Sequence, residues 1–259
     1  MARLVLVTGA SGSGKSTSLQ RLNPQTTIIL SPNRKMPPFA GAGYMYPTAD
    51  DPRVASGEVA ANRFVLQDVT QIRDCFFAIA QNYTHVTDVV VEDLTHYMNR
   101  RTMSASFMND SGFGKWNKFG ADFYEALVSV AEELPQHMTI YVIGHVETKD
   151  NGDINLQTSG KLLDNTINLP SYFTYALYTT VIPKGMEFEH VFMTRTNGAV
   201  KVAKTPVGLF SRMYIPNDLA AVRDRILAYE QLPPEVATNV EALNAWAAEQ
   251  DTKDFGALA

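Results

Sequence analysis

One short stretch restricts the fold of this chain more than any other. Residues 8–17, TGASGSGKST, follow the apolar run RLVLV and precede SLQRL. They match the pattern G-x-x-x-x-G-K-[ST], placed between a strand-like run and a helix-like segment. Small residues let successive backbone N–H groups turn inward around an anion, and a helix beginning at Lys15 would point its unpaired N–H groups at the same anion. The stretch therefore predicts a strand, a tight phosphate-binding turn and a helix in direct succession.

A nucleoside triphosphate bound in this turn would give each residue type a role. Lys15 is expected to reach the β- and γ-phosphates, and Ser16 to ligate Mg²⁺. The residues expected to contact ATP are Gly9, Ala10, Ser11, Gly12, Ser13, Gly14, Lys15, Ser16 and Thr17. The alternative, a glycine- and serine-rich turn with a chance lysine, is disfavoured because the pattern and its context match together.

Two acidic residues close the next clear strand. Residues 86–93, VTDVVVED, read as a buried strand that ends in Glu92 and Asp93. A phosphate-binding turn needs a carboxylate at the end of a neighbouring strand to hold Mg²⁺. Adjacent strand residues point to opposite faces, so the two acids cannot share one role. We favour Glu92 as the metal ligand over Asp93; the other acid would orient water or cap the following helix. A purely capping role for both stays open.

The remaining pattern predicts an α/β fold. Apolar runs at 26–31, 63–67 and 137–145 read as strands, and residues 68–83 and 115–134 have helical spacing. Strands that alternate with helices predict a mostly parallel sheet with helices on both faces. The runs at 173–182 and 188–194, joined by a short turn, predict an antiparallel extension near the C-terminus. Residues 32–57 are rich in proline and glycine, which predicts a long loop.

Charge separates the chain into two predicted parts. Residues 217–259 hold eight acidic and three basic residues and carry the whole net charge of −5. We therefore predict a core at 1–216, whose balanced charge is compatible with a polyanionic partner, and an acidic helical tail at 217–259. The lone Cys75 excludes a disulfide framework and favours a reducing cytosol. No run approaches the ~20 apolar residues of a membrane helix, so we expect a cytoplasmic protein with no membrane partner.

The order of several stretches resembles a known family. TGASGSGKST, VVVEDLTHYM, YVIGHVE, TSGKLLDNTI and TRTNGAVKVAKTPVGLF together resemble phage-encoded P-loop ATPases of the AAA or RecA-like type, related to phage single-strand annealing ATPases. The resemblance covers residues 3–230. It implies a RecA-like core, binding and hydrolysis of ATP with Mg²⁺, and a homo-oligomeric ring or filament. It also implies a role in phage DNA recombination, annealing or replication in the host cytoplasm.

The same resemblance suggests roles for residues outside the turn. Lys204 matches the first of two lysines that RecA-type proteins supply across a subunit boundary, although Pro206 stands at the second position. Arg195 or Lys161 could instead supply the positive finger. His145 resembles a γ-phosphate sensor, or is satisfied by nearby backbone; Glu147 could pair with it. RecA-type proteins carry a glutamate after the second strand, but SPNRKMPPF contains no acid, so rapid hydrolysis is not implied.

One basic and aromatic segment is a candidate nucleic-acid site. Residues 99–119 contain the bases Arg100, Arg101, Lys115 and Lys118 among the aromatics Phe107, Phe113, Trp116 and Phe119. This composition is typical of a single-stranded DNA platform, or the aromatics pack into the core. The loop at 146–159 is a second candidate. Two other functions stay open: a nucleotide or nucleoside kinase with Arg100 and Arg101 as a lid, and an ATP-gated binding module without turnover.

Overall fold

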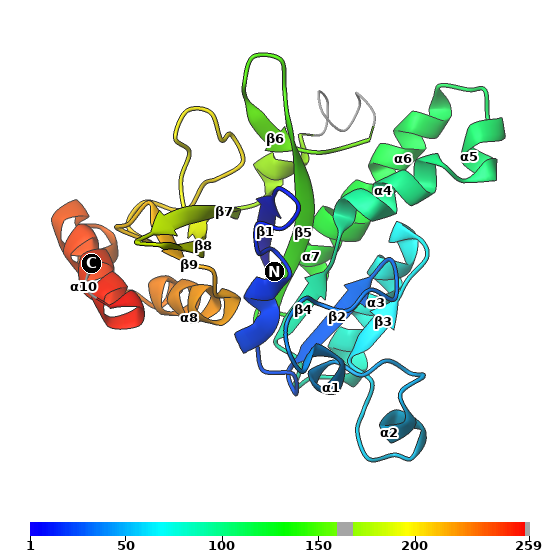
Figure 1. The fold of residues 1–259 in the computed structure, drawn as a ribbon, viewed down its shortest axis with the longest axis horizontal. Helices are drawn as coiled ribbons and strands as arrows, with labels where there is room; N and C mark the ends of the chain where they lie inside the picture. Colours follow the sequence, from blue (N-terminus) through cyan, green and yellow to red (C-terminus); the bar gives the residue numbers. More distant parts are fainter. Residues whose placement is uncertain (160–167, 257–259) are drawn as a thin grey trace.

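A nine-stranded sheet forms the centre of the computed structural model, which describes residues 1–159 and 168–256 (Figure 1). The strand order is β3-β2-β4-β5-β1-β7-β8-β9, and β6 pairs with β5 off this path. The strands are β1 (Arg3–Gly9), β2 (Thr27–Ser31), β3 (Arg63–Val65), β4 (Asp88–Val91), β5 (Thr139–Thr148), β6 (Ile154–Leu156), β7 (Tyr175–Lys184), β8 (Glu187–Met193) and β9 (Tyr214–Pro216). The pairs from β3 across to β7 are parallel, whereas β7–β8, β8–β9 and β5–β6 are antiparallel. The predicted mostly parallel sheet with an antiparallel C-terminal extension is confirmed.

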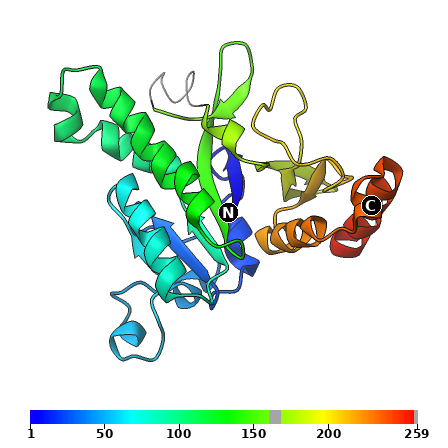
Figure 2. The same cartoon turned by 180° about the vertical axis from the view of Figure 1, so that it is seen from behind.

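Helices cover both faces of this sheet, as the sequence predicts. On one face lie α3 (Val69–Asn82), α4 (Leu94–Thr102), α5 (Ala105–Asn109), α6 (Gly114–Tyr124), a π-helical turn (Glu125–Ser129) and α7 (Val130–Glu133). On the other lies α8 (Leu219–Glu230), which buries residues in the second core; α9 (Pro234–Ala237) and α10 (Val240–Phe255) follow it, and ion pairs join α10 to α8. Figure 2 shows α3 and the α6–α7 helices in front of β2 and β4. Alternate strand residues feed the two cores: Leu4 and Leu6 of β1 face the first, and Val5 and Val7 the second.

The long loop predicted at 32–57 contains two short helices, α1 (Ala42–Met45) and α2 (Pro52–Ala55). At α2, the Asp51 side chain accepts a hydrogen bond from the Arg53 amide and so caps the first turn. Arg53 stacks over the Tyr44 ring at 4.4 Å. These local contacts give the loop a defined path between β2 and β3.

The described part of the acidic segment, residues 217–256, packs against the rest of the fold. Leu219, Val222 and Ile226 of α8 are buried in the second core. Arg225, 1% exposed, forms an ion pair of 2.6 Å with the equally buried Asp251 and a second of 2.8 Å with Asp254. Two of the acidic residues of this segment therefore face inward and join α10 to α8.

The helix predicted to begin at Lys15 is much shorter than expected. A five-residue 3₁₀ helix, Thr17–Arg21, follows the phosphate-binding turn, and the prediction of a longer α-helix there was wrong. Serine and threonine hydrogen-bond to nearby backbone and so compete with helix formation: the Ser18 hydroxyl donates to the Lys15 carbonyl at 2.5 Å. Leu22 is already extended, and Pro24 cannot continue a helix. The backbone amides of the turn, more than a helix dipole, must therefore hold an anion.

Candidate phosphate and magnesium site

The turn after β1 is folded tightly against β7. Gly12 and Gly14 have φ values of 78° and 104°, a region that glycine enters without steric cost. Gly9 lies so close to β7 that an added Cβ would stand 2.0 Å from the Thr179 hydroxyl oxygen. The Ser13 hydroxyl donates to the Ala10 carbonyl at 2.8 Å and also contacts the Thr179 hydroxyl. Glycines at these positions let the turn curl without a clash.

Two side chains from distant parts of the chain hold the outside of the turn. His190 of β8 places Nδ1 2.9 Å from the Ser13 carbonyl oxygen. Asn217, just before α8, donates from Nδ2 to the Gly14 carbonyl at 2.8 Å. The sequence analysis singled out neither residue. The antiparallel extension thus supports the shape of the turn.

Lys15 lies folded back over the turn. Its ammonium donates to the carbonyl oxygens of Gly9 and Ala10, each at 2.8 Å, and lies 3.4 Å from Nδ1 of His145. Burial lowers the pKa of Lys15 to about 8; the charge of Asp93 opposes this shift and that of Lys35 adds to it. The two carbonyls are neutral acceptors, so phosphate oxygens would bind this ammonium more strongly.

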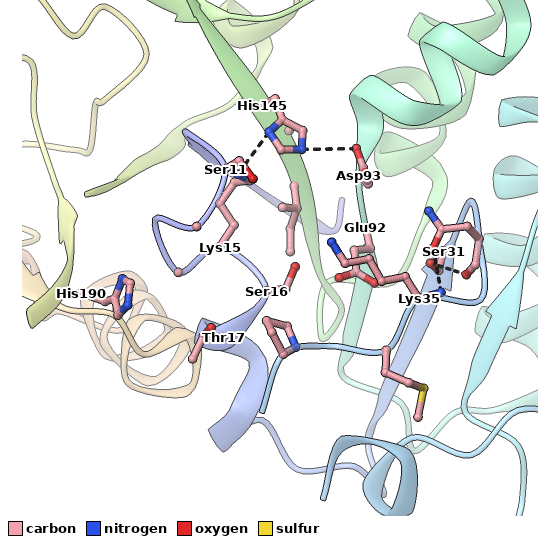
Figure 3. Close-up of a pocket in the computed structure, with 17 residues that line it drawn as sticks. Ser11, Lys15, Ser16, Thr17, Ser31, Lys35, Glu92, Asp93, His145 and His190 are labelled. Atoms are coloured by element: carbon pink, nitrogen blue, oxygen red, sulfur yellow. Dashed lines mark hydrogen bonds and ion pairs between the residues drawn. The ribbon is translucent and has the colours of Figure 1, made fainter. Parts of the chain in front are cut away.

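A cavity of about 360 Å³ opens beside the turn (Figure 3). Its walls come from the turn, the loop after β2, the ends of β4 and β5, and β8. The side chains and backbone that line it are Ser11, Gly12, Gly14, Lys15, Ser16, Thr17, Ser31, Asn33, Lys35, Met36, Pro38, Glu92, Asp93, Ile143, Gly144, His145 and His190. Most of the predicted site residues therefore meet in one space. Gly9, Ala10 and Ser13 shape the turn behind it.

Glu92 has the properties of a magnesium ligand. Its side chain is buried, and its Oε2 has no hydrogen-bond partner among the described residues. Burial raises the pKa of Glu92, the nearby Ser16 hydroxyl lowers it, and the charge of Asp93 raises it further. A buried carboxylate oxygen without a partner and an adjacent hydroxyl are the hard oxygen donors that Mg²⁺ prefers. Within residues 1–159 and 168–256, no group of three or more His, Cys, Asp or Glu could hold a metal ion, so phosphate and water would complete the coordination.

Asp93 has a different environment from Glu92. It adopts a left-handed conformation (φ 57°) and caps α4 by accepting from the His96 amide at 3.2 Å. Its carboxylate also lies 3.8 Å from Nε2 of His145. The expected strand alternation does not apply, because β4 ends at Val91 and both acids follow it and line the cavity. Their environments differ for another reason: Glu92 is buried beside Ser16, and Asp93, in a left-handed conformation, is a helix cap beside a histidine.

His145 lies between the turn and the acid pair because β5 runs between β1 and β4. The His145 amide donates to the Thr95 hydroxyl of α4 at 3.1 Å. Burial lowers the pKa of His145, the charge of Lys15 lowers it further, and Asp93 opposes the shift. The ring is therefore neutral at pH 7, with Nδ1 facing the Lys15 donor and Nε2 facing Asp93. It connects Lys15 to Asp93 across the cavity (Figure 3).

Two of the residues predicted to act on the phosphate of a neighbouring subunit, Lys204 and Arg195, lie away from the cavity. Lys204 donates from Nζ to the Ser171 carbonyl at 3.3 Å, and Arg195 donates to the Ser211 carbonyl at 3.0 Å. Within the part of the chain that the structure describes, neither is among the residues lining the cavity. Lys161 lies outside the described residues. Glu147, expected beside His145, instead lies 4.0 Å from Lys149.

The two arginines considered as a kinase lid are engaged elsewhere. Arg101 forms ion pairs with Asp68 at 2.9 Å and with Asp122 at 3.3 Å. Arg100 donates to the Pro32 carbonyl at 3.4 Å. Both belong to α4 and hold neighbouring elements together, so in this arrangement neither guanidinium group covers the phosphate-binding turn.

The aromatic residues of segment 99–119 pack against each other. The ring centroid of Phe107 lies 4.8 Å from that of Trp116 and 5.9 Å from that of Phe119. Lys115 donates to the Phe107 carbonyl at 3.0 Å. Phe113, 90% exposed, is the exception. Of the two alternatives for this segment, core packing therefore applies to Phe107, Trp116 and Phe119, because helical spacing directs these rings inward. Residues 146–159, the second candidate, include the β5–β6 pairing.

Comparisons with known proteins give only distant likenesses. No protein-family model and no curated protein sequence matches the chain. A solved structure of a KaiC-like protein from the archaeon Pyrococcus horikoshii is 10% identical, with a TM-score of 0.41 over 74% of this chain and 77% of that one. A RadB recombinase structure is 16% identical, with a TM-score of 0.44 over 76% of this chain and 82% of that one. The site is therefore interpreted from its own geometry.

Among the described residues, none of the helices has the length and apolar character to span a bilayer.

Proposed function

We propose that this chain is a magnesium-dependent nucleoside triphosphatase that uses ATP. One observation carries the proposal: Glu92, buried with an unpaired carboxylate oxygen, meets Ser16 and Lys15 of the glycine-rich turn in a single cavity. A turn of backbone amides alone would fit any phosphate. A buried carboxylate beside it repels an anion unless a divalent cation lies between them.

The residues of the chain would divide the work of phosphoryl transfer. The turn amides and Lys15 would bind the phosphates, and Ser16 and Glu92 would hold Mg²⁺. The metal, when bound, neutralises charge on the β- and γ-phosphate oxygens. Asp93 and neutral His145 are the groups placed to orient water at the terminal phosphate. Since phosphoryl transfer depends mainly on positioning and charge, this set supports hydrolysis without a glutamate on the loop after β2.

The finer expectations rest on the sequence resemblance. They are a homo-oligomeric ring or filament acting on single-stranded DNA in phage recombination, annealing or replication, with Lys204 or Arg195 acting across a subunit boundary. Among the described residues both side chains donate only to backbone carbonyls, which leaves their charges available to a neighbouring subunit. The kinase alternative loses its main support because Arg100 and Arg101 bind other parts of the fold.

The test measures ATP turnover with and without Mg²⁺ and single-stranded DNA, with particle mass measured alongside. Turnover that requires Mg²⁺ and that Lys15→Ala abolishes supports the proposal. Stimulation by DNA in a large assembly supports the finer role. Phosphate transfer to an added nucleoside would favour the kinase. Tight ATP binding without turnover under any condition would indicate a binding module.

A further inference from the structure

A second lysine enters the cavity from the side opposite Lys15. Lys35 belongs to the loop after β2, and its side chain extends toward Glu92 (Figure 3). The resemblance to RecA-type proteins predicts an acid on this loop, and the chain presents an ammonium group instead. None of the roles assigned above uses Lys35.

The loop that carries Lys35 is fixed by hydrogen bonds to its backbone. Arg63 of β3, only 4% exposed, donates to the Lys35 carbonyl at 2.9 Å. The Lys35 amide donates to Asn33 Oδ1 at 2.8 Å. Arg100 donates to the Pro32 carbonyl at 3.4 Å. Two arginines from different elements therefore hold the base of this side chain, so its position does not depend on an unanchored surface loop.

The Lys35 ammonium itself has no ion pair or hydrogen bond within the described part of the chain. The Glu92 carboxylate is close enough for Lys35 to lower its pKa, although burial is the larger effect and raises it. Burial is the main cause of the lowered pKa values of Lys15 and His145, and the charge of Lys35 lowers both pKa values further. This one cation, which lines the cavity, therefore lies within electrostatic reach of three of the other groups around it.

We propose that Lys35 binds the terminal phosphate of a nucleoside triphosphate and so lets the site distinguish triphosphate from diphosphate. The inference rests on the proposed function. A phosphate chain that starts at the turn and extends toward Glu92 would lie between Lys15 on one side and Lys35 on the other. An ammonium group at the terminal phosphate stabilises the charge that develops during transfer, a role other phosphoryl-transfer enzymes give to a finger arginine. Here the chain would supply that charge itself, without a neighbouring subunit.

The test compares binding of a non-hydrolysable ATP analogue and of ADP, both with Mg²⁺, by calorimetry. Lys35→Ala is expected to weaken binding of the analogue about tenfold and binding of ADP less than about twofold. The reason is that the substitution removes one charge-assisted contact that exists only in the triphosphate complex. Lys35→Arg should retain most of the preference. Arg34→Ala is the matched control, since Arg34 is the adjacent loop cation and pairs with Asp50 at the surface.

The outcomes separate the two proposals. Equal weakening of both nucleotides by Lys35→Ala, or no weakening, would overturn the role of Lys35 and leave the proposed function intact. Failure of the unmodified protein to bind either nucleotide would overturn the proposed function and the inference with it. Thermal melting of each variant shows whether the fold is retained; the Lys35 side chain is exposed, so little change is expected.

Discussion

The two sides of the phosphate-binding turn are built on different principles. The supporting wall, behind the turn, consists of Thr179, His190 and Asn217, which all contact the turn; His190 also lines the cavity, whereas Thr179 and Asn217 do not. The ligand-facing wall consists of Lys35, Glu92, Asp93 and His145, from the loop after β2 and the ends of β4 and β5. The first wall uses polar atoms to fix backbone shape. The second presents the buried Oε2 of Glu92 and the exposed ammonium of Lys35, neither of which has a partner among the described residues; on the first, Asn217 donates to the turn but its own Oδ1 is buried without a partner.

This difference has a thermodynamic meaning. A buried polar group without a partner costs free energy of folding, whereas a paired one contributes modestly to stability. The buried Glu92 carboxylate should therefore reduce stability and serve binding, whereas the exposed Lys35 should affect binding alone. The supporting wall should increase stability and affect binding only through the shape of the turn. Substitutions on the two walls should separate these effects.

The largest expected effect comes from Glu92→Gln. We expect turnover to fall about 100-fold, because the metal loses a charged ligand. The melting temperature should stay equal or rise, since the neutral amide is less costly to bury than a carboxylate. Steady-state kinetics and thermal melting check both parts. Full turnover, or a marked loss of stability, would remove Glu92 from the ligand-facing wall.

The next effect is structural and concerns Gly9→Ala. The new Cβ would lie 2.0 Å from the Thr179 hydroxyl and 2.7 Å from the Thr179 carbonyl oxygen. We expect a loss of about 1–3 kcal/mol in the free energy of unfolding, measured with denaturant, because the backbone of β7 must shift. Gly114→Ala is the control: its Cβ would meet nothing within 4 Å. Similar stability in the two variants would show that the turn is not packed as described.

The affinity for the triphosphate is expected to fall about tenfold per pH unit above the pKa of Lys15. The unbound ammonium has a pKa of about 8, and phosphate oxygens would raise that pKa in the complex. Affinity for the triphosphate should therefore be constant below pH 8 and fall as pH rises above it, because binding then requires uptake of a proton. Calorimetry at pH 7 and pH 9 measures the change. Lys15→Arg should show a flat profile, since guanidinium stays charged. An equally flat profile for the unmodified protein would contradict the prediction.

The smallest effect is expected for Asn217→Ala on the supporting wall. Removing the donor to the Gly14 carbonyl should cost about 1 kcal/mol of stability and change nucleotide affinity only slightly. Asn82→Ala is the matched control, because Asn82 makes a similar bond to the Ala78 carbonyl at an exposed position. Denaturant unfolding of the pair gives the comparison. A large loss of affinity with unchanged stability would show that Asn217 contacts the nucleotide instead of supporting the turn.

The ligand-facing wall was largely visible in the sequence, and the supporting wall was not. Residues of the ligand-facing wall stand in short motifs. The glycines around Lys15 and the acids that follow a valine-rich strand can be recognised from neighbouring positions alone. His190 and Ser13 are 177 positions apart, and Asn217 and Gly14 are 203 apart, so only the sheet order brings them together. Lys35 was missed because an acid was expected on its loop. The aromatic residues near Trp116 were left with two alternatives, because composition does not show which way a helix faces.

The anchoring of the turn by Asn217 has a practical consequence for fragment design. A chain shortened to residues 1–216 would lose the side chain that holds Gly14, and with it Arg225, whose charge is enclosed by Asp251, Asp254 and three aromatic rings. Crystallography or screening aimed at the nucleotide pocket alone should therefore use a fragment that continues through Phe255. The last helix of the chain, through its ion pairs with Arg225, helps to stabilise the part of the fold that supports that pocket.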